Sequence, residues 1–351
     1  SAPLREIDLL VHQSAGCAGA QLPVSRGTVR MHDNKLGVVA IGRNEGERLR
    51  RCLSSVLPVV QATVYVDSGS NDGSNRMAAE MGAEVIDLDL SRPFTAARAR
   101  NEGLHWLMLR HPDIDFVQFV DGDCEIVPGW LAAASEFLEK HPSHAVVCGR
   151  RRERYPERSV YNRLCDEEWN TPIGDAMSCG GDAMMRVTAL QAVGGYRDSM
   201  IAGEEPELCV RLRQQGWLIR RLDHEMTLHD AAITRFSQWW KRTVRSGHAF
   251  AAGAWLHGAP PERHWVWETR RSWFWGILLP LSIAIAMIGL GPWAALLALA
   301  YPLQWLRLFW RNGSARSSTF LVIGKFPEAL GALKFHIARL RGVAGTIIEY
   351  K

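Results

Sequence analysis

The sequence predicts an α/β protein whose mostly parallel β-sheet carries helices on both faces. Short apolar runs alternate with stretches of helical periodicity, and polar turns rich in Gly, Ser, Asp or Asn follow the early apolar runs. The 351 residues are also enough to bury a large core. Strands that alternate with helices form parallel sheets, whose ligands bind at the carboxyl ends of the strands. We therefore expect a functional site where the polar turns gather.

The expected elements follow one another in a regular order. Strands are expected at residues 36–41, 63–66, 83–90 and 116–120, with helices at 48–60, 75–82 and 94–110 between them. Later strands are expected at 144–150 and 218–230, a strand or turn and then a short helix within 175–196, and helices at 205–217 and 236–256.

Composition limits the class of protein. The chain is 47% apolar and 22% charged, as folded proteins are, and its net charge of +4 gives no indication of nucleic-acid binding. Arg outnumbers Lys, which suits phosphate recognition and is equally explained by codon bias. The seven cysteines are scattered without a C-x-x-C pair, which favours a reducing compartment and no zinc cluster. The N-terminal segment does not have the pattern of a signal peptide.

A long apolar block lies near the C-terminus. Residues 273–306 contain no charged residue, and a membrane-spanning helix needs about 20 apolar residues. The block predicts two short spans broken at Gly291-Pro292, with a re-entrant hairpin or two core helices as alternatives. Arginines flank both ends, which predicts that both flanks are cytoplasmic. Tryptophans at the ends resemble an interfacial belt: Trp273, Trp275, Trp305 and Trp310.

These patterns divide the chain into five parts. We expect an N-terminal arm (1–35), a catalytic domain (36–250), a juxtamembrane linker (251–272), a transmembrane or re-entrant helical hairpin (273–310) and a C-terminal amphipathic helix and tail (311–351). In the last part, apolar residues at helical spacing alternate with basic ones, as in helices that lie at a membrane interface.

Two aspartates follow the expected strand at 116–120. Residues two apart at the end of a strand point to the same side, so Asp121 and Asp123 should face one cavity. Carboxylates with water and substrate phosphates are the ligands that Mg²⁺ or Mn²⁺ prefers. A solvated turn would explain one such pair equally well. The surrounding strand-turn-helix units favour the metal site.

At this point the sequence resembles an inverting family 2 glycosyltransferase of the membrane-associated bacterial type, with the GT-A fold. The resemblance covers about residues 36–250 and rests on six motifs in order: VVAIGRNEGERLRRCLSSV, VYVDSGSNDGS, RARNEGL, FVDGDCEIVPGWL, CGGDAMMRVTALQAVGGY and GEEPELCVRLRQQGW. It implies a nucleotide-sugar donor and a divalent metal, Mn²⁺ or Mg²⁺.

The resemblance also implies residue roles on the donor side. Asn44 and Glu45 would line the nucleotide pocket, Asp67 would contact the base, Asp121 the ribose, and Asp123 the metal. Ser68 stands where many relatives have a second Asp. Arg100 and Asn101 match positions near the donor sugar and phosphates, with a solvated helix start as the alternative. Asp182 matches a region near the transferred sugar or acceptor, with a helix N-cap as the alternative.

Transfer of a sugar needs a base for the acceptor hydroxyl. Glu205 occupies the place that the family usually gives to an Asp, and it is the expected base, with Glu204 beside it. Glu207 is expected to be a solvated helix charge. His229 is a candidate metal ligand, with a structural histidine as the alternative. Arg242 and Arg245 are candidates for the phosphate side, with a basic face near anionic lipid as the alternative.

The sequence thus predicts a metal-dependent glycosyltransferase at the inner membrane, with its catalytic domain in the cytoplasm. The apolar block beside the domain suggests a lipid-linked acceptor, such as a polyprenyl-(di)phosphate saccharide of cell-surface polysaccharide or glycolipid synthesis. A processive polysaccharide synthase is one alternative, although Gln238 is followed by WWKR and departs from the Gln-x-x-Arg-Trp motif. An inactive membrane scaffold with the same fold is the other.

Overall fold

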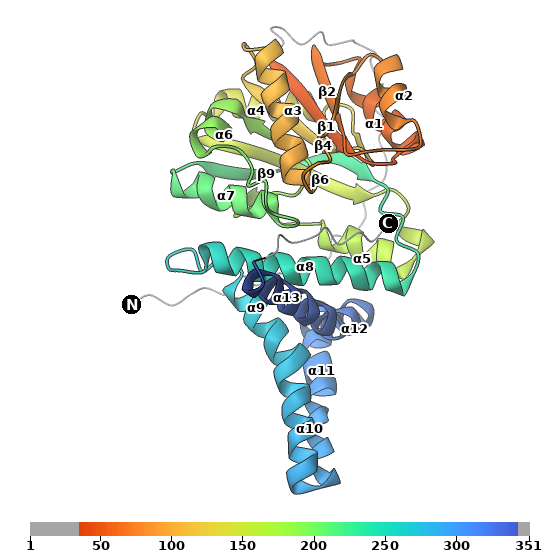
Figure 1. Ribbon diagram of the computed structural model, residues 1–351, viewed down its shortest axis with the longest axis vertical. Coiled ribbons are helices and arrows are strands. Elements are labelled where there is room, and N and C mark those ends of the chain that lie inside the picture. Colours follow the sequence, from red (N-terminus) through yellow and green to blue (C-terminus); the bar gives the residue numbers. More distant parts are fainter. Residues whose placement is uncertain (1–34, 343–351) are drawn as a thin grey trace, which may run out of the picture. The chain divides into compact units, whose positions relative to one another are not determined.

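The computed structural model describes residues 35–342 (Figure 1). The expected N-terminal arm, apart from residue 35, and the last nine residues of the expected tail, 343–351, lie outside the described residues. One mixed β-sheet with the strand order β3-β2-β1-β4-β8-β6-β9-β5 forms the centre of the described chain, and β7 pairs with β9 at its side. This sheet determines where the site lies.

The first half of the sheet is parallel, as expected. Its strands are β1 (Leu36–Gly42), β2 (Ala62–Asp67), β3 (Glu84–Asp87) and β4 (Phe116–Asp121), and the helices between them are α1 (Glu47–Val56), α2 (Ser74–Glu80) and α3 (Ala96–Arg110). Gly42 pairs with Asp67 on one side of β1, and Ile41 pairs with Asp121 on the other. The register therefore brings both acidic strand ends beside the first polar turn.

Close packing of α3 on this half depends on a glycine. A Cβ atom on Gly103 would lie 2.4 Å from Cγ1 of Val39, so a side chain here would push α3 off the sheet. The strands beneath are buried along almost their whole length, as the continuous apolar runs predict for a sheet covered on both faces. α3 is thereby held with Arg100 over the carboxyl end of the sheet.

The second half of the sheet is mixed. It contains β5 (Cys124–Ile126), β6 (His144–Glu153), β7 (Gly174–Asp175), β8 (Ala183–Arg186) and β9 (Leu218–His229), with α4 (Trp130–Lys140), a 3₁₀ turn (Pro156–Arg158), α5 (Val160–Glu168), α6 (Val187–Val193) and α7 (Glu204–Gln214). β8 is antiparallel to β4 and β6, whereas β6 and β9 are parallel. β5 and β7 were not expected, because two or three residues give no periodicity to read.

Helices make up the remainder of the described chain. They are α8 (Phe236–His257), α9 (Val266–Trp273), a π-helical turn η2 (Phe274–Leu278), α10 (Leu279–Leu290), a 3₁₀ segment η3 (Pro292–Leu299), α11 (Ala300–Asn312), α12 (Ala315–Ile323) and α13 (Lys325–Leu340). The expected linker at 251–272 contains the end of α8 and most of α9, and residues 258–265 connect the two helices.

α13 packs closely against α8 through small residues. A Cβ atom on Gly331 would lie 2.0 Å from the carbonyl oxygen of Val244, and one on Gly247 would lie 1.9 Å from the carbonyl oxygen of Glu328. The leucine face of α13 is directed elsewhere, and Leu340 is 83% exposed. α13 therefore has exposed apolar residues beside basic ones, as an amphipathic helix does.

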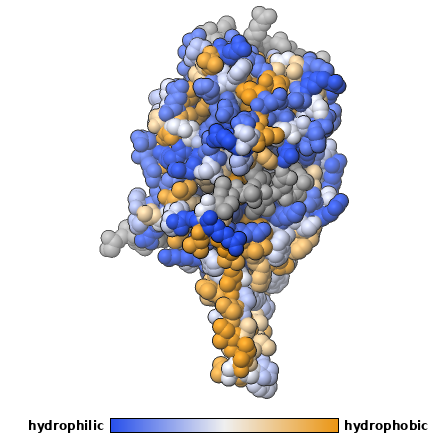
Figure 2. Space-filling model, in the orientation of Figure 1, coloured by the Kyte–Doolittle hydropathy of each residue, from blue (hydrophilic) through white to orange (hydrophobic). Residues whose placement is uncertain are grey.

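The apolar block forms a helical hairpin (Figure 1). Val266–Leu290 is one continuous helix that is long and apolar enough to cross a membrane, and none of its most apolar window is buried. The chain reverses at Gly291, whose φ of 84° favours glycine, so the expected break at Gly291-Pro292 is confirmed. The return arm is 3₁₀ before it becomes α11. Figure 2 shows the hydrophobic surface of this hairpin.

Candidate active site

A cavity of about 780 Å³ opens at the carboxyl ends of the parallel strands. The turn after β1, the turn after β4, the start of α7 and one face of α8 form its walls. The predicted site residues that line it are Asn44, Glu45, Arg100, Asp121, Asp123, Glu204, Glu205, His229, Arg242 and Arg245. Residues separated by up to two hundred positions in the chain therefore meet in one place.

The first two turns are locked together beside the cavity. The Asn44 side chain accepts a hydrogen bond from the N–H of Asn71, and the N–H of Asn44 donates to Ser70 Oγ, both at 2.8 Å. Asp67 is buried and does not line the cavity; its carboxylate accepts the N–H groups of Gly69 and Ser70. Its position in the structure is that of a residue that shapes the turn. Ser68, its neighbour, faces the cavity.

Asp121 and Asp123 both line the cavity, but their surroundings differ. The side chain of Asp121 is 28% exposed, and it makes ion pairs with Arg100 at 2.8 Å and with Arg151 at 3.2 Å. Asp123 is buried, and its Oδ2 lies 3.3 Å from Nε2 of His229. The two carboxylates thus belong to two different centres.

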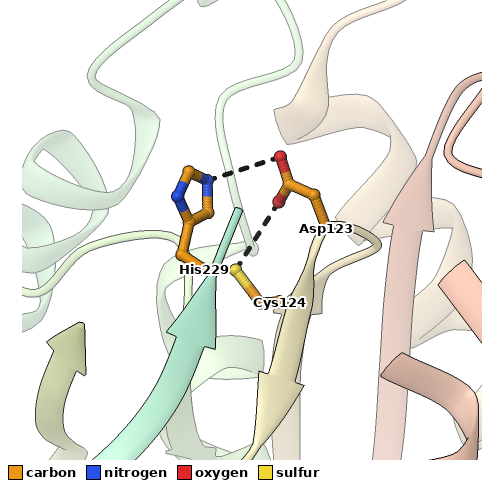
Figure 3. A group of neighbouring side chains, drawn as sticks. All are labelled: Asp123, Cys124 and His229. Carbon is orange, nitrogen blue, oxygen red and sulfur yellow. Dashed lines mark hydrogen bonds and ion pairs between the residues drawn. The ribbon is translucent and has the colours of Figure 1, made fainter. Parts of the chain in front are cut away.

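The second centre brings together Asp123, Cys124 and His229 (Figure 3). β5 and β9 are antiparallel here and pair Cys124 with His229, which places the imidazole opposite the turn after β4. Nδ1 of His229 lies 3.5 Å from Glu153 Oε2, and Nε2 faces Asp123. Burial, aided by Arg151, lowers the pKa of His229, so the ring is neutral at pH 7.

This donor set fits a divalent cation. A neutral imidazole nitrogen and a carboxylate oxygen are both acceptors, and a cation between them would satisfy both. Burial raises the pKa of the Cys124 thiol well above its usual range, so the sulfur remains protonated and contributes no thiolate ligand. Oxygen and imidazole donors without a thiolate suit Mn²⁺ or Mg²⁺ better than a structural zinc.

Two acidic residues begin α7 on the other side of the cavity. Nη1 of Arg100 makes an ion pair with each of them, at 3.0 Å from Glu204 Oε1 and at 2.7 Å from Glu205 Oε1. Burial first, and then Glu204, raise the pKa of Glu205 to about 7, and Arg100 opposes this rise. A carboxylate with that pKa can accept a proton near neutral pH.

Comparison with known proteins identifies the domain. The family model described as Glycosyl transferase family 2 matches residues 38–193. These residues therefore form a family 2 glycosyltransferase domain. A mannosyltransferase from Pyrobaculum calidifontis, solved with GDP-mannose and Mn²⁺, has the same fold, with a TM-score of 0.57, 17% identity, and 88% of each chain covered. The expected GT-A fold is thus confirmed.

Two other similar proteins have shorter matches. A glucosyl-3-phosphoglycerate synthase from Mycobacterium tuberculosis, solved with Mn²⁺, UDP-glucose and phosphoglyceric acid, has a TM-score of 0.46 and 18% identity over 64% of this chain and 80% of its own. A TPR repeat-containing protein of Synechococcus elongatus is 28% identical over 131 residues, which are 37% of this chain and 30% of that protein. The match therefore spans less than a third of that curated relative.

The family 2 domain contains one cavity residue that the sequence motifs did not single out. Arg151 on β6 lies 3.2 Å from Asp121 Oδ2 and 3.4 Å from Asp182 Oδ2, and the ring of Trp169 stacks on it at 4.9 Å. Strand alternation could have revealed it. Its even-numbered neighbours do not line the cavity and pair with acidic residues: Arg150 with Asp166, Arg152 with Glu225 and Arg154 with Glu125. Arg151 is odd-numbered, and alternate residues of a strand point to opposite faces.

Besides Asp67, two predicted residues of the family 2 domain do not line the cavity. Asn101 donates to the carbonyl of Tyr196 and to Asp198, both at 2.7 Å, and so ties down the loop before α7. Asp182 is buried and accepts the N–H of Asp121 at 3.1 Å. The helix-cap alternative for Asp182 is wrong, because β8 follows it and α6 begins only at Val187. Both residues support the cavity from behind.

Two further expectations need correction. Glu207 is not a solvated helix charge, because it is fully buried and bonded to Arg211 at 2.7 Å and to His257 at 3.0 Å. Arg100 is 2% exposed, so a solvated helix start is wrong for it as well. Burial of these charges depends on partners from distant parts of the chain, which helical periodicity cannot reveal.

The two predicted arginines of α8 line the far wall of the cavity. Arg242 makes two hydrogen bonds of 2.9 Å to the carboxylate of Glu168, on α5. Arg245, one turn further on, lines the cavity together with Ser246 and Phe250. This wall thus contributes two guanidinium groups to the cavity, one of them paired with Glu168.

Proposed function

We propose that this protein transfers a sugar from a nucleotide-activated donor to an acceptor hydroxyl, with inversion at the anomeric carbon. The observation that carries the proposal is the pair of centres in one cavity: a buried Asp123–His229 pair that fits a divalent cation, and Glu205 across from it. The family match supports the reaction class, and the mannosyltransferase of the same fold was solved with a nucleotide sugar and Mn²⁺.

The proposed donor site lies along the first two turns. Asn44 and Glu45 would contact the nucleotide, and Asp67 would fix the turn beside the nucleobase. Asp121 would accept hydrogen bonds from the ribose hydroxyls. Asp123 and His229 would hold Mn²⁺ or Mg²⁺. When bound, the metal would neutralise charge on the departing diphosphate. Arg151 adds a fixed positive charge in the same region, close to Asp121.

The proposed reaction is a single displacement. The acceptor oxygen forms a bond to the anomeric carbon while the bond from that carbon to the diphosphate oxygen breaks. Glu205 accepts the proton of the acceptor hydroxyl, and the nucleoside diphosphate leaves with the bonding electron pair. Because the pKa of Glu205 is about 7, activity should fall as the pH drops below 7 and the base becomes protonated.

We propose a lipid-linked acceptor, such as a polyprenyl-(di)phosphate saccharide, and a membrane location. One face of α8 lines the cavity, and another packs through Gly247 on α13, which in turn contacts α9 and η2 at the base of the hairpin. A helix is about 10 Å across, so an acceptor phosphate near Arg245 would lie close to the membrane surface. Basic residues flank the hairpin and favour a cytoplasmic catalytic domain at the inner membrane: Arg270, Arg271, Arg307 and Arg311.

Purified full-length protein incubated with nucleotide sugars, Mn²⁺ and either lipid-linked or soluble acceptors would test the proposal. We expect release of a nucleoside diphosphate together with a sugar on the lipid acceptor. Transfer only to soluble acceptors would contradict the lipid assignment. Absence of transfer from every donor tested, with the protein folded and metal-loaded, would contradict the proposed reaction and favour the scaffold alternative.

A further inference from the structure

Arg100 lies at the centre of a group of charges that lines the cavity. Its guanidinium makes ion pairs with Asp121 at 2.8 Å, Glu204 at 3.0 Å and Glu205 at 2.7 Å. These three partners come from the end of β4 and the start of α7, 21 and about 104 residues away in the chain. One buried cation therefore joins the donor side of the cavity to the expected base.

The surroundings leave little freedom to this guanidinium. The side chain of Arg100 is 2% exposed, and the ring of Tyr196 lies 5.6 Å from its Cζ. The loop before β8 passes over it at Gly181, where a Cβ atom would lie 2.7 Å from Nη2 of Arg100 and 2.9 Å from Asp121 Oδ2. A side chain at position 181 would thus displace the Arg100–Asp121 pair. The glycine allows the loop to cover that pair.

Arg100 pairs with three carboxylates, and Arg151 pairs with one of them, Asp121, so in this group carboxylates outnumber guanidiniums. As the proposed base, Glu205 needs to be ionised to accept a proton, and burial opposes its ionisation. Burial and then Glu204 raise the pKa of Glu205, whereas Arg100 lowers it. The other titratable groups that face Glu205 are Asp121, which also raises its pKa, the Tyr196 hydroxyl and the Cys179 thiol. Burial raises the pKa of Tyr196, and the contact with Cys209, followed by burial, raises the pKa of Cys179, so both stay protonated. Arg100 is the cation that favours the ionised base.

We propose that Arg100 is a positioning residue that holds the Glu205 carboxylate ionised and directed at the acceptor, instead of a direct ligand of the donor phosphates. This inference rests on the proposed function, in which Glu205 is the base. The guanidinium of Arg100 contacts Asp121 with Nη2 and both glutamates with Nη1. One rigid planar group therefore fixes the carboxylates of Asp121 and Glu205 relative to each other.

The test is the pH dependence of kcat in Arg100→Gln and Arg100→Lys. In Arg100→Gln the acidic limb of the profile should move to higher pH by about one unit or more, kcat at pH 7 should fall at least about tenfold, and the donor KM should change little. Arg100→Lys keeps the charge without the planar fork, so the limb should stay near its original pH while kcat falls.

Glu204→Gln serves as the matched variant on the same group of charges. It removes the like charge beside Glu205, so the acidic limb should move to lower pH, opposite to Arg100→Gln. This variant decides the matter if the Arg100 variants fail to fold, and thermal melting would establish their folding. A purely structural role of Arg100 would lower kcat in Arg100→Gln without moving the acidic limb of that variant.

The outcomes separate this inference from the proposed function. Limbs that move in opposite directions support it. The inference is overturned if the acidic limb of the pH profile does not move in a folded Arg100→Gln protein or in Glu204→Gln. It is also overturned if Arg100→Lys raises the donor KM strongly and leaves kcat unchanged. A wild-type protein that transfers no sugar overturns the proposed function itself. The wild-type activity is therefore measured first.

Discussion

The cavity contains two buried acidic centres that handle charge differently. At the base centre, the chain supplies its own cation, because Arg100 lies between three carboxylates. At the metal centre, a neutral His229 faces Asp123, and the donor set fits a cation from solution. Burial raises the free-energy cost of a charge, so positive charge stabilises the carboxylates of both centres. In the proposed function, the difference teaches that the permanent cation belongs beside the expected base, and the exchangeable one where the diphosphate would bind and leave.

The largest effect is expected from removing the metal ligand. Asp123→Ala should lower kcat at least about 100-fold and abolish stabilisation by Mn²⁺ with a nucleoside diphosphate, because a carboxylate is the main charged ligand of the pair. Steady-state kinetics and thermal melting measure both effects. Glu125→Ala is the matched control, since Glu125 lies two residues further on, pairs with Arg154 and does not line the cavity. Retained metal-dependent stabilisation in Asp123→Ala would place the metal elsewhere.

The next largest effect is expected from replacing the proposed catalytic base, Glu205, and it concerns both kcat and stability. Glu205→Gln should lower kcat by about 100- to 10,000-fold while the protein still binds the nucleoside diphosphate. Loss of donor binding would instead assign Glu205 to the donor site.

The same variant should be more stable than the wild type at pH 8. The pKa of Glu205 is raised from 4.5 to about 7 in the folded protein, so the wild type loses stability as the pH rises from about 4.5 through about 7. Gln cannot ionise, so the variant should gain on the order of 2 to 3 kcal/mol at pH 8 and much less at pH 5. Urea unfolding at the two pH values measures this gain. An equal gain at both would contradict the raised pKa.

A smaller effect is expected from the arginine between the two centres. Arg151→Gln should lower kcat/KM for the donor by about 10- to 100-fold, because a charge-assisted hydrogen bond to a phosphate or carboxylate is lost. Arg152→Gln is the control on the opposite side of the same strand, where Arg152 is 54% exposed and pairs with Glu225. Equal losses in both variants would indicate damage to β6 and not a role in the cavity.

The smallest effect on the two centres is expected from the hairpin. Ile285→Asp combined with Ile288→Asp places charge on its exposed apolar surface, where the two residues are 60% and 89% exposed. The variant should float poorly with vesicles of anionic phospholipid, whereas its affinity for a nucleoside diphosphate should change less than about twofold. Unchanged flotation would contradict membrane insertion of the hairpin.

The sequence predicted the elements whose signal is local. Apolar runs located β1, β2 and β4, and the rule that ligands bind at strand ends placed Asp121 and Asp123 in the cavity, which the structure confirms. The position of Glu205 came from a motif at the start of α7. The strand inferences need only neighbouring residues and the periodicity of helices and strands, whereas the choice of Glu205 rests on the resemblance to family 2 glycosyltransferases.

What the sequence did not reveal depends on distant contacts. Arg100 meets Glu204 across 104 residues and Arg151 meets Asp121 across 30, so neither partner could be read from spacing. Glu207 resembles a solvated helix charge until Arg211 and His257 are seen to enclose it. The antiparallel strands β5 and β7 are too short to give a pattern. Buried charges are therefore the least predictable part of this site.

The most direct test of the central claim is a thermal-melting panel of nucleoside diphosphates, with and without Mn²⁺, on the wild type and on Asp123→Ala and His229→Ala. We predict that one nucleoside diphosphate raises the melting temperature of the wild type most, that the rise requires Mn²⁺, and that both variants lose it. An equal rise in the presence of a chelator, or in both variants, would contradict a cation-dependent donor site at Asp123 and His229.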